Sequence, residues 1–309
     1  MIDRRFLGFT GEAAPETAPS QKQRAKRLDA LRVACQQYVR DALLPELALA
    51  LGRSPLERDR WRVTMDPDDV DAQTVLFTYP AEAASSDYIR PVVKIELGAR
   101  SDTEPCVEPS ITPYVADALP AVCGDCGFTV RTVTPERTFW EKVALLHEEA
   151  HRAGDVPPKA RLARHYYDVW ALIQAGVAER AMENASLFAR VAAHRAVFFH
   201  KSREAQVSLQ PGTLAVVPSG SRRVAWRRDY EAMRESMFFD EPPSFDDILD
   251  VVGEFERRFN ARVGPPSRPT LESLAHRDRA GLPERLVCLG AKLLDVGEVF
   301  EPIEAADQL

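Results

Sequence analysis

Thr134-Pro-Glu-Arg-Thr-Phe-Trp-Glu-Lys142 and Arg164-His-Tyr-Tyr-Asp168 lie in the stretch around which this chain is organised. The stretch runs to Ala175 and predicts two helices joined by a polar connection. At the start of the first helix, the threonine hydroxyl can cap free N–H groups, and the proline after it loses no helical hydrogen bond. Gly176 suits the end of the second helix.

The first of these helices has an apolar stripe, and its periodicity also predicts a charged face. At 100° per residue, one stripe collects Phe139, Val143, Leu146 and Ala150. The side chains expected to point to solvent are Arg137, Glu141, Glu148 and Arg152. Lys142 belongs to neither set, because it lies at the edge of the apolar stripe.

Two interpretations of Lys142 are open. A lysine at such an edge commonly buries its stem and keeps its ammonium in water. Composition favours a more specific role, since lysine supplies seven of the 40 Lys and Arg residues and arginine supplies the other 33. A chain that prefers arginine this strongly has placed a compact ammonium here, which differs chemically from a guanidinium.

The second helix is also expected to have an apolar and a charged face. Its apolar stripe consists of Leu162, Tyr166, Val169, Trp170 and Ile173. Arg161, Arg164 and Asp168 share the opposite face. Arg164 and Asp168 are four residues apart, so one interpretation is a weak surface ion pair. The functional alternative is that this face lines a cleft that receives phosphate and metal.

A strand predicted at residues 92–97 carries a candidate metal ligand. Val93, Ile95 and Leu97 share one face, and Lys94 and Glu96 share the other. A carboxylate in mid-strand among apolar residues needs a partner or a metal. Glu96 is therefore either paired with its neighbour Lys94 on a wet sheet face, or part of a metal site. Further strands are expected at residues 1–9, 61–65, 74–79 and 128–133.

Charge and cysteine content restrict the classes of function. The net charge of −7 argues against a protein that binds nucleic acid through its overall charge. Local basic patches remain candidates for RNA binding, namely Lys159, Arg161, Arg164 and His165, and the cluster of Arg222, Arg223, Arg227 and Arg228 around Trp226. Five cysteines without framework spacing argue against a secreted disulfide scaffold. No apolar run reaches the ~18 residues of a membrane span, so we expect a cytoplasmic protein with no membrane partner.

These motifs together resemble those of the AbiEii/AbiGii toxin family of nucleotidyltransferases. The likeness rests on Thr138-Phe-Trp-Glu-Lys142 followed by Arg164-His-Tyr-Tyr-Asp168, and on Pro91 to Ser101 upstream. Downstream it continues in Pro211-Gly-Thr-Leu214, in Arg228 to Glu235 and in Glu241 to Phe245. Several spaced motifs in the order of the family thus cover the chain from Met1 to about Asn260.

The resemblance implies a function and a set of site residues. The family implies Mg²⁺-dependent transfer of nucleotides from a nucleoside triphosphate to RNA, with tRNA as the acceptor, and a separately encoded antitoxin as partner. By motif, Lys142 would contact the nucleotide phosphates and Arg164 would support the same site. Asp168 would orient these cations or an acceptor. Glu96 matches the acidic strand position of the family and would serve the metal.

The chain departs from the pattern of the family in two motifs. The resemblance implies a Gly-Gly-Thr-x-Leu-Ser loop and an Arg-x-Ser-x-Asp-x-Asp strand, and neither occurs in this sequence. We therefore expect an incomplete catalytic site in this chain, with the missing segment encoded upstream. Gly220-Ser221 with Asp229 and Glu231 formally fits a transferase signature, but this segment is predicted to be helical, and helical residues two apart diverge by about 200°.

The predicted fold is α+β. It comprises a partial nucleotidyltransferase-like mixed sheet with a long helix kinked at Pro45, followed by a mostly α-helical C-terminal half. We expect a sheet domain at 1–133, a helical domain with the Lys142 and Arg164/Asp168 motifs at 134–262, and a linker with a helical extension at 263–309. Two alternatives to an active transferase remain, namely a non-catalytic module that binds a nucleotide or a partner, and a helical RNA-binding protein.

Overall fold

The computed structural model describes residues 1–53, 57–80, 91–123, 126–152, 158, 160–199, 202–238 and 241–262. These residues form two compact units, Met1–Val133 and a second unit that begins at Thr134. The linker and helical extension expected at 263–309 lie outside the described residues. The fold is α+β with a mostly helical C-terminal half, as predicted. Among the described helices, none combines the length and hydropathy that a bilayer crossing requires.

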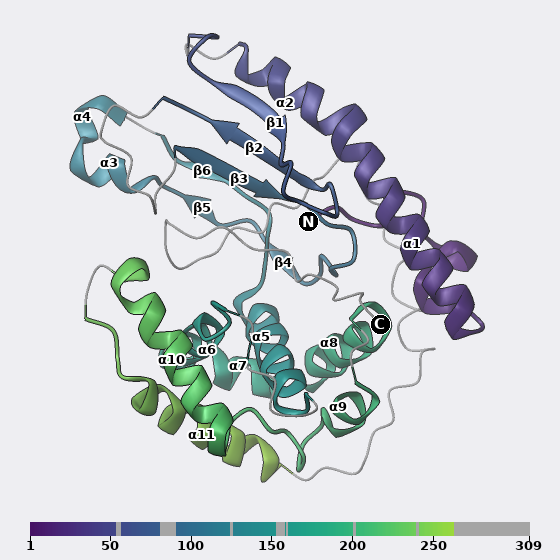
Figure 1. The fold of residues 1–309 in the computed structure, drawn as a ribbon, viewed down its shortest axis with the longest axis vertical. Coiled ribbons are helices and arrows are strands. Elements are labelled where there is room, and N and C mark those ends of the chain that lie inside the picture. The colour runs from purple at the N-terminus through teal and green to yellow at the C-terminus, as the bar shows by residue number, and fades with distance from the viewer. Residues whose placement is uncertain are drawn as a thin grey trace. The chain divides into compact units, whose positions relative to one another are not determined.

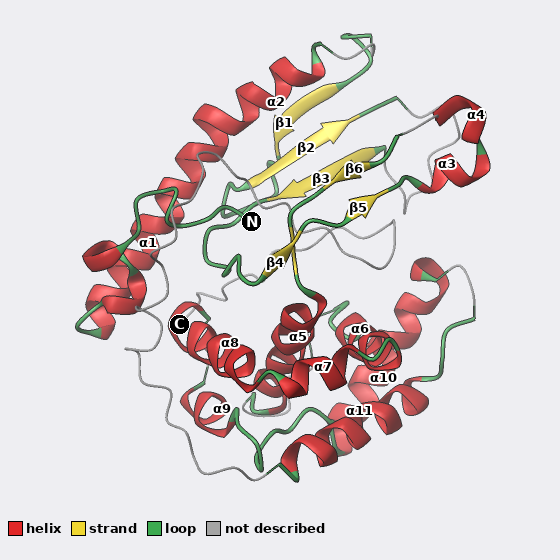
Figure 2. Cartoon of the chain, turned by 180° about the vertical axis from the view of Figure 1, so that it is seen from behind, coloured by secondary structure: helices red, strands yellow, loops and turns green. Residues whose placement is uncertain are grey.

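A three-stranded antiparallel sheet forms the centre of the first unit. Its strands are β1 (Arg62–Met65), β2 (Thr74–Thr78) and β3 (Val92–Glu96), in the order β1-β2-β3. The register pairs Met65 with Val75 and Val75 with Ile95. Val75 on the middle strand is fully buried. The three predicted strands are therefore confirmed, and all described strand pairs are antiparallel (Figure 2).

A long helix runs along this sheet (Figure 1). It consists of α1 (Gln21–Tyr38), a widened π-helical turn (Val39–Leu43) and α2 (Leu44–Leu51). Leu31, Cys35 and Val39 bury one side of it. Pro45 has no N–H to donate, and its ring would press on the carbonyl four residues earlier in a regular helix. The wider turn just before Pro45 relieves this conflict, so the predicted irregularity is confirmed.

The remainder of the first unit differs from two sequence predictions. The strand expected at 128–133 is two short strands, β6 (Phe128–Thr129) and β7 (Thr132–Val133), which pair with β5 (Ser110–Ile111) and β4 (Cys106–Val107) respectively. Helices α3 (Tyr114–Ala118) and α4 (Pro120–Cys123) lie between β5 and β6 along the chain. The strand expected at 1–9 is reduced to one bridge, in which the N–H of Ile2 donates to the carbonyl of Gly98. The Asp3 carboxylate then accepts the N–H of Arg5 and turns the chain.

The second unit is helical. Its helices are α5 (Pro135–Ala150), α6 (Arg164–Gln174), α7 (Val177–Glu183), α8 (Ala185–Phe198), α9 (Arg203–Ser208), α10 (Gly220–Met237) and α11 (Phe245–Asn260). The single helix expected from Ala181 to Phe199 is interrupted at Asn184, whose side chain caps α8 by accepting the N–H of Leu187. The capping box predicted at Ser244 and Asp247 is present at the start of α11.

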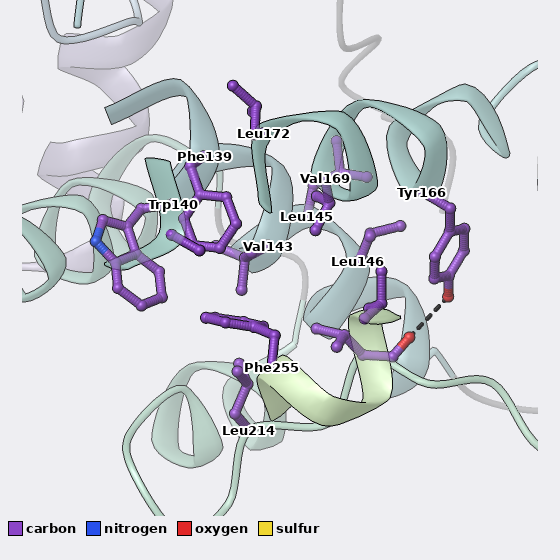
Figure 3. Packing of buried hydrophobic residues seen from close by; sticks show 14 of the residues in the cluster. Phe139, Trp140, Val143, Leu145, Leu146, Tyr166, Val169, Leu172, Leu214 and Phe255 are labelled. Atoms are coloured by element: carbon purple, nitrogen blue, oxygen red, sulfur yellow. Dashed lines mark hydrogen bonds between the residues drawn. The ribbon is translucent and has the colours of Figure 1, made fainter. Parts of the chain in front are cut away.

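One hydrophobic core holds these helices together (Figure 3). Phe139, Val143 and Leu146 of α5 are fully buried, and Phe255 of α11 meets Phe139 edge-on at 5.0 Å between ring centroids. Most of the predicted stripe of α6 belongs to this core or packs against it. The hydroxyl of Tyr166 donates to the carbonyl of Val216 over 2.8 Å, so this buried polar group is satisfied.

The solvent-facing side expected for α5 is wrong for Arg137 and Glu148, whereas Glu141 and Arg152 are 33% and 34% exposed. Arg137 is 0% exposed and donates to Glu141 over 2.8 Å. Glu148 is also buried, and both of its oxygens accept from Arg195 of α8, at 2.7 and 2.8 Å. The reason is that α6, α7, α8 and α9 all pack against α5. A helix surrounded in this way buries its charged face as well as its apolar stripe, and buried charges must then be paired.

Candidate functional site

Lys142 is held at a defined position on α5. The Thr134 side chain accepts the N–H of Arg137 at the start of the helix, and Pro135 occupies the first turn, as predicted. Phe139 and Leu146 anchor the helix in the core on either side of Lys142 along the sequence. The Lys142 side chain is 12% exposed. Its ammonium therefore does not simply extend into water but meets groups of the neighbouring helix α6.

The partners of Lys142 are Asp168 and His165, one turn apart on α6. The Lys142 ammonium forms a short ion pair with the Asp168 carboxylate. Its Nζ lies 3.4 Å from Nδ1 of His165, and that nitrogen lies 3.6 Å from Oδ2 of Asp168. The three side chains thus form a compact cluster between α5 and α6. Asp168 is bound to Lys142 and not in the surface ion pair with Arg164 that was one interpretation of the sequence.

Burial and charge set the ionisation of this cluster. Burial alone would raise the pKa of the Asp168 carboxyl, but Lys142 and His165 outweigh it and hold that pKa well below its usual range. Burial lowers the pKa of His165 to about 4. At neutral pH the cluster therefore contains an ammonium, a carboxylate and a neutral imidazole. His165 adds no positive charge to the basic patch proposed for it.

Arg164 lies one turn before Asp168, at the start of α6. Within the described part of the chain, no hydrogen bond or ion pair engages its guanidinium. It is half-buried and remains available to an anion. Lys159, which belonged to the same predicted patch, lies outside the described residues.

Three of the four arginines of the second basic cluster are engaged by other groups of the chain. Arg223 and Arg227 both donate to Asp246, at 2.7 and 2.6 Å, and Arg222 donates to backbone carbonyls. Trp226, around which these arginines cluster in the sequence, is buried in the core. The transferase signature at Asp229 and Glu231 lies within α10, so those two side chains diverge as expected. Asp246 thus offsets part of the positive charge of the cluster, and Asp229 and Glu231 do not converge on one metal.

Glu96 belongs to the first unit, on β3. Its Oε1 lies 3.1 Å from Nζ of Lys94, and the same Nζ lies 3.7 Å from Oδ2 of Asp66. The neighbour pair with Lys94 is therefore present, but not on a wet face, because the Glu96 side chain is only 9% exposed. Val93 on the opposite, nominally apolar face is 49% exposed. Leu97 on that same face is 8% exposed, so neither face of β3 is uniformly covered.

A comparison with protein families identifies the chain. Residues 9–251 match the family model described as nucleotidyl transferase AbiEii toxin, type IV toxin–antitoxin system. The chain belongs to this family. No curated protein and no solved structure matches it. For this AbiEii-family chain, a nucleotide is the implied substrate and an antitoxin the implied partner.

The residues around Glu96 do not fit a complete metal centre. Asp66 and Glu96 supply two carboxylates, but the point on which they converge is taken by the Lys94 ammonium. Nowhere in the described ranges do three metal-ligating side chains of His, Cys, Asp or Glu come together. A hard cation such as Mg²⁺ requires oxygen ligands and no competing positive charge. We therefore derive no step through a metal.

Two tertiary contacts near the candidate site residues were not found by sequence reasoning. Asp66 lies at the end of β1, and its place beside Lys94 depends on the hairpin that pairs β1 with β2. Asp229 was considered only as an accidental match, yet its carboxylate accepts the N–H groups of Arg161 and Ala163 just before α6. Both contacts join segments that are distant along the chain. The spacing of residues along one helix or strand carried no signal for either.

Proposed function

We propose that this AbiEii-family chain is a toxin that binds a nucleoside triphosphate at the Lys142–Asp168 cluster and transfers nucleotides to RNA, with tRNA as the acceptor. The observation that carries the proposal is the largely buried Lys142–Asp168 pair beside the unengaged guanidinium of Arg164. Nucleotidyl transfer is catalysed largely by positioning and by neutralising phosphate charge. Two cations on packed helices, Lys142 of α5 and Arg164 of α6, suit that task.

The proposed role of each residue follows from its charge and contacts. In the free chain, Asp168 neutralises Lys142 and prevents an uncompensated buried charge. A triphosphate brings several negative charges, so the Lys142 ammonium can exchange its carboxylate partner for a phosphate oxygen. The guanidinium of Arg164 can add a bidentate contact to a phosphate group. Asp168 would then orient the cations, or the acceptor hydroxyl, from α6.

The proposal also includes magnesium, with Glu96 as one of its ligands. Magnesium is included because metal ions neutralise phosphate charge in this class of reaction. Glu96 is proposed as a ligand because it is a nearly buried carboxylate on β3 that lies beside the same Lys94 ammonium as Asp66. Its exchange of Lys94 for a metal is testable by magnesium titration of the wild type and of Glu96→Gln.

Binding of the nucleotide is the first experiment. Calorimetry of the purified chain with each nucleoside triphosphate should show binding, and Lys142→Ala should weaken it by about 10- to 100-fold, the loss of one charge-assisted hydrogen bond. Lys26→Ala is the matched control, because it removes the same charge from an exposed position on α1. Equal affinities of the wild type and Lys142→Ala would contradict the assignment of the site.

Transfer is tested separately. The chain is incubated with α-labelled nucleoside triphosphates, total tRNA and magnesium, and labelled RNA is separated on a gel. Label in tRNA that disappears in Lys142→Ala and in Asp168→Asn supports the transferase. Nucleotide binding with no transfer to any RNA would instead support the non-catalytic binding module.

A further inference from the structure

Helix α10 holds the C-terminal end of α5. Two nitrogens of the Arg222 guanidinium donate to the carbonyls of Ala150 and Arg152, each over 2.7 Å. The last carbonyls of a helix have no partner within the helix and carry the negative end of its dipole. A guanidinium satisfies both needs at once, because its planar fork can reach two oxygens.

The same helix holds the N-terminal end of α6. The Asp229 carboxylate accepts the N–H of Arg161 over 2.7 Å and that of Ala163 over 2.8 Å. Ala163 occupies the cap position of α6 and has no side chain that could cap the helix itself. Arg161 has a φ of 66°, in the left-handed region that side chains other than glycine rarely adopt. Asp229 therefore stabilises a strained turn and the positive end of the α6 dipole together.

Both contacts come from one face of α10. Arg222 and Asp229 are seven residues apart, which is about two helical turns. Trp226 lies between them, is nearly buried, and meets Tyr166 of α6 edge-on at 5.1 Å between ring centroids. The face thus presents a cation to the end of α5, an aromatic ring to the side of α6, and an anion to the start of α6. Each group matches the charge of the helix end that it contacts.

We propose that α10 is a positioning element that sets Lys142 of α5 against Asp168 of α6. Arg222 and Asp229 are positioning residues, since neither contacts the cluster itself. Asp229 acts more directly than Arg222, because the turn that it holds leads straight into Arg164 and His165 of α6. The role of α10 in positioning the cluster does not depend on a ligand. The expected effect of α10 on nucleotide binding rests on the proposed function.

Asp229→Asn tests this role, with Glu231→Gln as the matched control. The asparagine keeps the shape but replaces one accepting oxygen with an NH₂ group, which repels the backbone N–H that it faces. Glu231 is an exposed carboxylate on the same helix, paired loosely with Arg234 at 3.5 Å. Three quantities are measured, namely the melting temperature, the pKa of His165 from the NMR titration of its ring, and the affinity for the nucleotide.

The expected result for Asp229→Asn is a change in the cluster and not only in stability. The His165 pKa should move from about 4 toward 6.5 as its enclosure between the helices loosens, and nucleotide affinity should fall roughly tenfold. Glu231→Gln should leave both unchanged. Arg222→Lys tests the contact at the end of α5, since a single ammonium cannot reproduce the hydrogen bonds of the guanidinium to two carbonyls. This variant should also shift the His165 pKa and the nucleotide affinity.

The proposal is overturned if Asp229→Asn and Arg222→Lys lower the melting temperature but leave the His165 pKa at its wild-type value. In that case α10 only adds stability. If the wild type binds no nucleotide, the proposed function fails, but the His165 titration still decides the role of α10. The two failures are therefore distinguishable.

Discussion

The buried side chain of His147 should make the folded chain less stable at mildly acidic pH. It is fully buried on α5, where its Nδ1 accepts the N–H of Ala215 over 3.0 Å and its Nε2 lies 3.0 Å from the carbonyl of Ala205. This arrangement needs a neutral ring, with the proton on Nε2. Burial, aided by the neighbouring His151, lowers the pKa of His147 from 6.5 to about 4.

The sign and the size of the effect follow from linkage. The unfolded chain takes up the proton near pH 6.5 and the folded chain only near pH 4, so stability is complete above the first value and declines as the pH falls toward the second. At pH 5 the unfolded histidine is protonated about 30:1 and the folded one is mostly neutral. The resulting loss in the free energy of unfolding is about 2 kcal/mol.

Urea denaturation at pH 8 and pH 5 measures this loss. His147→Gln is the test variant, because an amide can accept from Ala215 and donate to Ala205 without titrating. The variant should lose about 2 kcal/mol less than the wild type between the two pH values. His165 is present in both proteins and drops out of the comparison. An equal loss in wild type and variant would refute the reasoning.

Three further predictions concern stability. Glu148→Gln leaves the buried guanidinium of Arg195 without its carboxylate and should cost about 3–5 kcal/mol in the free energy of unfolding. Glu136→Gln breaks the ion pair with Arg180, which is more exposed than the Glu148–Arg195 pair, and should cost less than about 1 kcal/mol. Similar costs for the two variants in urea titrations would contradict this prediction. Thr134→Ala should cost about 1 kcal/mol by removing the cap of α5, and Thr134→Ser should restore most of it. Gly176→Ala should lower the melting temperature through a cost of about 1–2 kcal/mol, because residue 176 has a φ of 69°; an unchanged melting temperature would show that the turn can relax.

Local features of the sequence were sufficient to predict several elements. The cap at Thr134, the proline after it and the capping box at Ser244 are short-range signals, and the helices begin where these signals place them. The position of Lys142 at the edge of an apolar stripe also follows from the helical period alone. Such features depend only on residues within one or two turns.

Features that depend on neighbours in space could not be predicted in the same way. The helical period assigned Arg137 and Glu148 to solvent, because it cannot count how many helices surround α5. It grouped Asp168 with Arg164 on one face of α6, but the choice of Lys142 as partner depends on the packing of α6 against α5. The role of Asp229 depends on a contact across 66 and 68 positions of sequence.

The widened turn at Val39–Leu43 has a consequence for changes in chain length. A π-helical turn contains one residue more than an α-helical turn would need, and each added residue rotates the following side chains by about 100°. Deleting one residue within this turn, together with Pro45→Ala, would leave an unbroken α-helix whose buried sides stay aligned. Deleting one residue of α1 after Leu31 would instead rotate Leu31 by about 100° relative to Val39, so that the two would no longer share a buried side. The widened turn is thus a place at which the long helix can lose a single residue and keep its buried sides aligned.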